Sequence, residues 1–315
     1  MSNSPNGRPF LGAYAMAPKD PRDEAEFYAG VAALDIAGLE LPLPPEGAPS
    51  LTPEWRRQNL RPEWDLLMTV IPTVVRRVKD DPRYGLASVD ADGRAAAVAD
   101  AGRARDLALR IADEQGRPAV VAMQLHSAPG GTGASSEALA RSLEEVVTWD
   151  LAGADVLIEH CDALVPGRTA AKGYLSLADE LAAVASVGSD LVGVSVNWGR
   201  SAIEGRSVAT PLEHVQAVAR AGVLRAVVFS GATDQETAWG PAWSDAHIPP
   251  RADGATDLAL APSAASLLGP DEIAATLAAA GDQCLVAIKV AVRPADADVA
   301  TRLAVALAAL GLVRL

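Results

Sequence analysis

The sequence predicts a single-domain α/β protein folded as a (β/α)₈ barrel, on three observations. Short apolar runs alternate with longer segments of helical periodicity along the 315 residues, a pattern typical of parallel βαβ units. Eight such runs occur, most of them about 27 to 37 residues after the one before. A closed barrel needs eight units and roughly 250 residues, which this chain provides.

The expected elements follow one another in alternation. Expected strands, each a short apolar run, are residues 11–16, 37–41, 66–70, 119–125, 155–158, 192–196, 226–229 and 285–290. Expected helices, with apolar residues at intervals of three and four, are residues 20–31, 93–115, 135–148, 176–187, 211–221, 271–280 and 298–310. A proline-rich loop separates the second strand from the third.

An open, doubly wound sheet is the alternative fold. Its usual glycine-rich phosphate loop is missing after the first strand, where residues 16–20 read Met-Ala-Pro-Lys-Asp. The sequence contains no evident domain boundary and no tandem repeat. We therefore expect one domain over residues 1–315, with residues 1–8 as a flexible N-terminus.

Composition and charge exclude several classes of partner. The net charge of −13 opposes contact with phosphate backbones, so we expect no nucleic-acid partner. The sequence lacks a basic cluster, a signal peptide and a long apolar run, so we expect no membrane association and a cytoplasmic location. Two cysteines are too few for a disulfide framework. The oligomeric state stays open, and a homodimer is one option.

Polar side chains collect where the expected strands end. Catalytic groups of such barrels lie at the C-terminal ends of the strands and in the loops that follow. The candidates at these positions are Glu40, His126, Glu159, Asn197, Trp198, Arg200, Trp239, Asp245, His247 and Lys289. The sequence thus predicts a site at this end of the barrel.

Three candidates are expected to carry the chemistry: Glu159, Lys289 and His126. Glu159 belongs to the densest polar cluster of the chain, and a carboxylate there suits a general base. Lys289 interrupts an apolar strand, where an ammonium is costly unless it is paired. A salt bridge to Glu159 or Glu40 is the structural alternative for this lysine. His160 follows Glu159 directly, so strand alternation points it to the opposite face, toward a packing role.

The remaining candidates are expected to bind the substrate, a small molecule such as a sugar or sugar acid. Their side chains offer hydrogen bonds, charges and indole rings that stack on sugar faces. They are Glu40, Asn197, Arg200, Trp198, Trp239, Asp245 and His247.

Three segments resemble the xylose-isomerase-like superfamily of barrels. They are residues 12–15 (Gly-Ala-Tyr-Ala), 38–42 (Gly-Leu-Glu-Leu-Pro) and 158–162 (Ile-Glu-His-Cys-Asp). Nearly the whole chain resembles an uncharacterised bacterial family within that superfamily, which includes sugar phosphate isomerases and epimerases. The resemblance implies a barrel whose strand ends supply Glu, Asp, His and Glu to a divalent metal.

The sequence departs from this implied ligand pattern. Glu159 matches the first carboxylate, but Asn197, Ser230 and Lys289 stand where the resemblance implies Asp, His and Glu. Arg200 stands where a further histidine is usual. An ammonium repels a divalent cation at short range, so we expect the metal site to be altered or absent.

The segment 245–250 resembles the Asp-x-His stretch of metal-rich members of the superfamily. If a divalent metal (Mg²⁺, Mn²⁺ or Zn²⁺) is bound, we therefore expect Glu159, Asp245 and His247 to hold it. No other cofactor is indicated.

Several functions stay open. The first is an isomerase or epimerase that transfers a proton next to a carbonyl, with Glu159 or Glu40 as base and Lys289 and His126 in place of the metal. In a variant of it, Lys289 is the Schiff-base nucleophile of a lyase. The second is a non-catalytic sugar-binding protein on a degenerate isomerase barrel. A nuclease for abasic DNA is the third, and the net charge opposes it.

Overall fold

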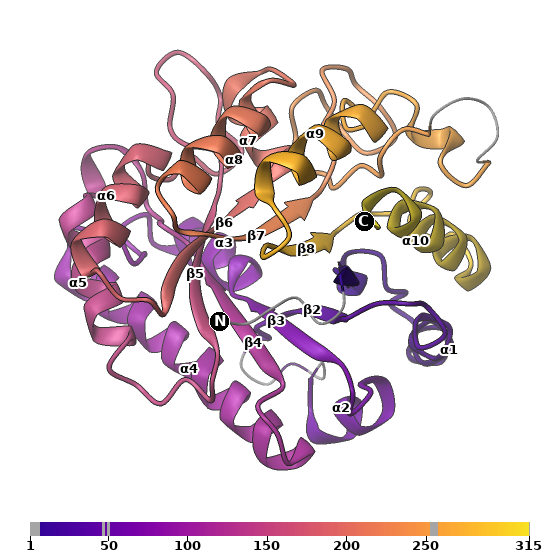
Figure 1. Cartoon of the computed structure of the whole chain (residues 1–315), viewed down its shortest axis with the longest axis horizontal. Helices are drawn as coiled ribbons and strands as arrows, with labels where there is room; N and C mark the ends of the chain where they lie inside the picture. The colour runs from indigo at the N-terminus through magenta and orange to yellow at the C-terminus, as the bar shows by residue number, and fades with distance from the viewer. Residues whose placement is uncertain (1–6, 46–47, 49–50, 253–257, 315) are drawn as a thin grey trace.

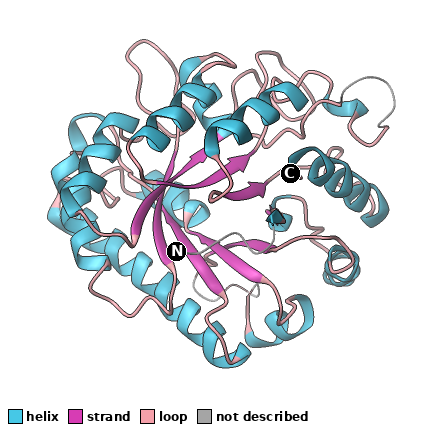
Figure 2. Cartoon of the chain, in the orientation of Figure 1, coloured by secondary structure: helices cyan, strands magenta, loops and turns pink. Residues whose placement is uncertain are grey.

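The computed structural model describes residues 7–45, 48, 51–252 and 258–314, and its eight parallel strands form a closed barrel. Figures 1 and 2 show the strands in the middle of the molecule and the helices around them. Each strand pairs with the one before it, and β1 (Phe10–Leu11) closes the ring against β8 (Leu285–Ile288). The predicted (β/α)₈ barrel is confirmed.

The strands lie where they were predicted, and most of their ends differ by no more than two residues. The others are β2 (Gly38–Pro42), β3 (Asp65–Thr69), β4 (Val120–Leu125), β5 (Asp155–His160), β6 (Val192–Asn197) and β7 (Leu224–Phe229). The first strand differs most from the prediction. It ends at Leu11, and the apolar residues Ala13–Ala15 form a 3-10 helix instead.

The seven expected helices are present. They are α1 (Pro21–Val31), α4 (Ala91–Gln115), α5 (Ser136–Val146), α6 (Leu177–Val187), α8 (Thr210–Arg220), α9 (Pro270–Ala280) and α10 (Val299–Val313). Three more were not predicted: α2 (Pro53–Asn59), α3 (Ile71–Asp80) and α7 (Trp198–Gly205). Helix α7 begins at the end of β6 without a loop, and Asn197 caps it by accepting a hydrogen bond from the Arg200 backbone N–H.

Strand alternation divides the buried side chains into two cores. A small apolar cluster fills the inside of the barrel and includes Phe10, Leu67, Leu157 and Val228. A much larger one lies between the sheet and the surrounding helices. The small inner cluster leaves the C-terminal end of the barrel interior to polar residues.

The two ends of the described chain meet. Helix α10 lies beside α1 (Figure 1). Arg8 Nη1 lies 3.7 Å from Asp35 Oδ1, and Arg314 donates to the Asp35 carbonyl at 3.1 Å. Residues 1–6 of the N-terminus that we expected to be flexible lie outside the described residues. Within the described part of the chain, no helix combines the length and apolar character needed to cross a bilayer.

Candidate functional site

Inward-facing side chains become polar toward the C-terminal end of the barrel. On β5, Leu157 belongs to the inner apolar cluster, and Glu159 follows it two residues later. After β8, Lys289 follows Ala287 in the same way. Because alternate side chains share a face of the sheet, both polar groups point into the barrel. Glu159 and Lys289 are fully buried.

Lys289 joins two buried carboxylates. Its Nζ donates to Glu40 Oε1 at 2.8 Å and lies 4.0 Å from Glu159 Oε1. The Tyr14 hydroxyl lies 3.3 Å from the same Nζ. The salt bridge considered from the sequence is therefore present, and it is closer to Glu40 than to Glu159.

Opposite charges continue beyond Glu159 toward the mouth of the barrel. Arg200 Nη1 lies 2.8 Å from Glu159 Oε1, and Arg200 Nε lies 3.2 Å from Asp245 Oδ2. Lys172 Nζ donates to the same Asp245 oxygen at 2.8 Å. We call this set the buried ion chain. Its members, in spatial order, are Glu40, Lys289, Glu159, Arg200, Asp245 and Lys172.

Glu159 is held in its ionised form. Burial alone would raise the pKa of this carboxyl, but Arg200 and Lys289 outweigh burial and keep the pKa well below its usual value. Both of its oxygens have partners, since His126 Nε2 lies 2.8 Å from Oε2 and Asn197 Nδ2 donates to Oε1 at 3.1 Å. The carboxylate is fixed and fully engaged.

Glu40 differs from Glu159 in the direction of its pKa shift and in the partners of its oxygens. Burial raises the pKa of its carboxyl, and the nearby Lys289 only partly offsets that effect. Its Oε2 is buried and has no hydrogen-bond partner among the described residues. Burial would lower the pKa of Lys289, but Glu40, Tyr14 and Glu159 raise it above its usual value, so the amine stays protonated.

Two histidines at the site are neutral at pH 7. Burial lowers the pKa of His126 to about 4 and that of His247 to about 4. The Nδ1 atom of His126 is buried without a partner in the described structure. His247 Nδ1 lies 2.7 Å from Ser230 Oγ and 3.4 Å from Asp245 Oδ1. A neutral imidazole carries a hydrogen on one nitrogen and a lone pair on the other. Each ring can therefore accept a proton or a hydrogen bond from a ligand.

Two candidate residues lie away from the ion chain. Trp198 is buried in the outer layer, where it lines a small cavity together with Leu212 and Thr276. Trp239 donates its indole N–H to the Ala291 carbonyl at 2.9 Å and lines a separate cavity of about 320 Å³. The other candidates come together: Glu40, His126, Glu159, Asn197, Arg200, Asp245, His247 and Lys289.

Sequence reasoning missed Lys172 and Tyr14. Tyr14 lies in the 3-10 helix that follows the first strand, and its place near the end of the first apolar run was the available signal. Lys172 lies in the long loop after β5, where no periodicity marks it, and it pairs with a residue 73 positions away. Only the folded chain reveals this contact.

The residues at the barrel mouth do not fit the divalent metal that the family resemblance implies. The Arg200 guanidinium lies between Glu159 and Asp245 and contacts both, so a metal held by Glu159, Asp245 and His247 would have to displace it. Lys289 adds a second fixed cation. Two cations at these distances oppose a third.

His160 lies on the other face of β5, as strand alternation predicted. Its ring nitrogens contact two carboxylates, Glu180 at 2.7 Å and Glu204 at 3.0 Å. Although burial opposes protonation, these carboxylates raise the pKa of His160 to about 10. The neighbouring Asp162 accepts backbone N–H groups of Ala171 and Lys172 and so holds the loop after β5.

Comparison with known proteins identifies the family. The chain belongs to the family described as a domain of unknown function (DUF4862), which matches residues 10–305. A protein of Salmonella typhimurium (strain LT2), described as the uncharacterized protein STM3670, is 37% identical over 251 residues, covering 76% of this chain and 77% of that protein.

Solved structures share the fold. An L-ribulose 3-epimerase superposes with a TM-score of 0.59 at 14% identity, covering 98% of this chain and 94% of that one. The D-psicose 3-epimerase of Clostridium cellulolyticum H10, solved with D-tagatose, gives 0.55 at 15% identity and 97% coverage of both chains. The IOLI protein with a bound zinc atom gives 0.54 at 12% identity, covering 96% and 94%. These structures therefore share the closed-barrel fold of this chain.

Proposed function

We propose that this protein is an isomerase or epimerase of a sugar or sugar derivative that transfers a proton next to a carbonyl without a metal at the barrel mouth. The observation that carries the proposal is the pair of buried carboxylates with opposed pKa shifts, Glu40 raised and Glu159 lowered. Carboxylates whose environments separate their pKa values in this way are typical of acid–base sites. The fold shared with sugar epimerases supports the same class of reaction.

Glu40 is the proposed base. A base that works near neutral pH needs a raised pKa and an oxygen that no other protein group engages. Glu40 meets both conditions, because burial raises its pKa and its Oε2 has no partner among the described residues. Glu159, engaged at both oxygens, is the better candidate for holding the cations and His126 in position.

The two buried cations are the proposed electrophiles. Proton removal next to a carbonyl leaves negative charge on the carbonyl oxygen, which a fixed cation stabilises most strongly in a site that excludes water. The Lys289 ammonium donates to the proposed base itself, and Arg200 lies one step further along the ion chain. Substrate entry requires the loops that carry Lys172 and Asp245 to move, because the carboxylates beneath them are fully buried.

Proton exchange with solvent tests the proposal directly. The protein is incubated in D₂O with a panel of ketoses, aldoses and sugar acids, and ¹H NMR follows the signal at the carbon next to each carbonyl. We expect loss of that signal for one class of compound. Glu40→Gln keeps the side-chain shape, and we expect it to slow the exchange by about 10²- to 10⁴-fold.

A binding protein without catalysis is the second candidate. The observation in its favour is that each member of the buried ion chain lies beside an opposite charge of the protein itself. Thermal-shift measurements with the same panel separate the two proposals. A compound that raises the melting temperature but exchanges no proton in D₂O would favour the binding protein.

The ion pair with Glu40 disfavours the Schiff-base variant. Imine formation needs the neutral amine, whereas the carboxylates raise the pKa of Lys289. Borohydride treatment with a keto-acid is expected to leave Lys289 unmodified by mass spectrometry. An adduct on this lysine would restore the lyase proposal.

A further inference from the structure

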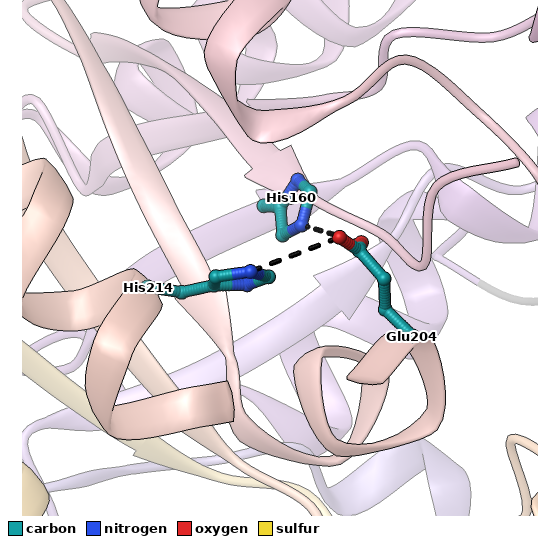
Figure 3. A group of neighbouring side chains, drawn as sticks. All are labelled: His160, Glu204 and His214. Atoms are coloured by element: carbon teal, nitrogen blue, oxygen red, sulfur yellow. Dashed lines mark hydrogen bonds and ion pairs between the residues drawn. The ribbon is translucent and has the colours of Figure 1, made fainter. Parts of the chain in front are cut away.

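A second polar cluster lies outside the barrel, on the opposite face of β5 from the ion chain. His160 at the end of β5, Glu204 in α7 and His214 in α8 converge there (Figure 3). His160 Nε2 lies 3.0 Å from Glu204 Oε2, and His214 Nε2 lies 3.7 Å from Glu204 Oε1. One donor atom from each residue falls within 4.8 Å of the other two.

Both imidazoles are held with the same nitrogen facing the centre. His160 Nδ1 lies 2.7 Å from Glu180 Oε2, and His214 Nδ1 lies 3.0 Å from Ser201 Oγ. Glu180 and Ser201 are fully buried, so these contacts fix the orientation of the rings. Metal-binding histidines are commonly oriented in this way, by a carboxylate or other polar group on the nitrogen that does not bind the metal.

We infer that His160, Glu204 and His214 form a zinc-binding site, separate from the barrel mouth, that joins α7 and α8 to β5. Two imidazoles and one carboxylate suit Zn²⁺ or a related transition metal, whereas Mg²⁺ and Ca²⁺ prefer oxygen ligands throughout. No lysine or arginine contact to Glu204 Oε1 or Oε2 appears among the described side-chain bonds. In this respect Glu204 differs from Glu159, which contacts Arg200 and Lys289. Because the pKa of His160 is about 10, zinc must displace the Nε2 proton of this ring, which is released to solvent.

Zinc binding requires the three side chains to move closer together. Zinc bonds of about 2.0–2.1 Å place tetrahedral ligand atoms roughly 3.3 Å apart, whereas the three ligand atoms here lie within 4.8 Å of one another. The Nε2–Oε separations of 3.0 and 3.7 Å involve different oxygens of Glu204, so one oxygen must turn toward both rings. The side chains of Glu204 and His214 are 15% and 14% exposed. A metal and a fourth ligand, such as water, can therefore reach the cluster from solvent.

Metal binding to the full-length protein tests the inference. The chain is stripped with EDTA and titrated with ZnCl₂, with a chromophoric chelator as competitor, and Co²⁺ is added separately to record its visible d–d bands. We expect one zinc per chain and a Co²⁺ spectrum of four- or five-coordinate type. Glu204→Gln and His214→Gln are each expected to weaken zinc binding by about 100-fold or more, and Ser201→Ala by about 10-fold.

His247→Gln is the matched control, because His247 is the histidine beside Asp245 at the barrel mouth. We expect this variant to keep wild-type zinc affinity. The inference is overturned if His247→Gln abolishes zinc binding while His214→Gln does not, or if the wild-type chain binds no zinc. If a variant fails to fold, ¹⁵N-edited NMR of the histidines in the wild-type protein, recorded with and without zinc, is used in place of that variant. Zinc must then shift the Nε2 signals of His160 and His214, and unchanged signals overturn the site.

Discussion

Glu40 and Lys289 depend on each other for their charge. Both are fully buried, and the 2.8 Å bond between them is the closest contact of either charged group. Removing one member of a buried pair leaves an uncompensated charge, whereas removing both is often tolerated. This asymmetry gives a test of the ion chain at the scale of single residues.

Lys289→Met is expected to lower the free energy of unfolding by about 3–5 kcal/mol at pH 7, because Glu40 loses its cation. Adding Glu40→Gln removes the stranded charge, so the double variant should recover most of that loss. Urea denaturation of the wild type, the two single variants and the double variant measures both effects. Equal instability of Lys289→Met and the double variant would show that the pair is not coupled.

His126 is expected to make stability depend on pH. Its pKa is about 4 in the folded protein and about 6.5 in an unfolded chain. Between these values the unfolded state binds more protons, so the free energy of unfolding falls as the pH falls from 6.5 to 4, by roughly 3 kcal/mol for this group. His126→Gln should remove that part of the pH dependence. Urea denaturation at pH 7 and pH 5 measures it, and a pH dependence equal to that of the wild type would refute the assignment.

At the scale of elements, the strands were predictable because their pattern is local. Two positions after each inner apolar residue the side chain faces inward again, as at Glu159 and Lys289. Strand ends located from the sequence therefore indicated most of the candidate residues that the fold brings together. The indoles of Trp198 and Trp239 were not predictable in this way, because residues beyond a strand end no longer follow its alternation.

The missed helices have a physical reason too. Helices α2 and α3 each carry proline in the first turn, where the missing N–H costs no hydrogen bond. The proline-rich sequence before the third strand indicated a loop where α2 forms. Helix α7 starts at a strand end and is only eight residues long. Contacts such as Lys172 to Asp245 join loops that are far apart in sequence, which no local pattern reports.

Gly12, the residue after β1, lies against the side chain of Lys289. A Cβ at this position would lie 2.9 Å from Lys289 Cβ and 2.9 Å from Lys289 Cγ. Because both atoms belong to the base of the side chain, relief requires the backbone to move. Gly12→Ala is expected to lower the free energy of unfolding by about 1–3 kcal/mol. Gly311→Ala in α10 is the control, since its Cβ meets nothing within 4 Å, and it should be neutral or slightly stabilising.

The bond between Lys172 and Asp245 ties the loop after β5 to the loop after β7. Lys172→Met should let both loops open more often, with hydrogen exchange about 5- to 10-fold faster, as expected for a loss of about 1 kcal/mol. Mass spectrometry of peptides from residues 163–175 and 236–248 measures this. Lys79→Met, at an exposed position of α3, is the control. Unchanged exchange in both loops would mean that other contacts hold them closed.

At the scale of the whole molecule, closure of the barrel rests on few residues. Strand β1 has two residues and pairs with β8 through both. Arg302 in α10 reinforces this junction, because its guanidinium donates to the carbonyls of Met16, Ala295 and Ala297. The side chain thereby fastens the last helix to the segment that follows the first strand.

Arg302→Met is expected to lower the free energy of unfolding by about 1–3 kcal/mol, because it leaves the buried Met16 carbonyl and two partly buried carbonyls without their charged donor. If the barrel unfolds as one unit, the loss appears as a shift of a single transition, seen equally by far-UV circular dichroism and by tryptophan fluorescence. Arg220→Met, at an exposed position of α8, should change the midpoint by little. Separate transitions for the two probes would contradict this expectation. They would mean that the first and last βα units unfold independently of the rest of the barrel.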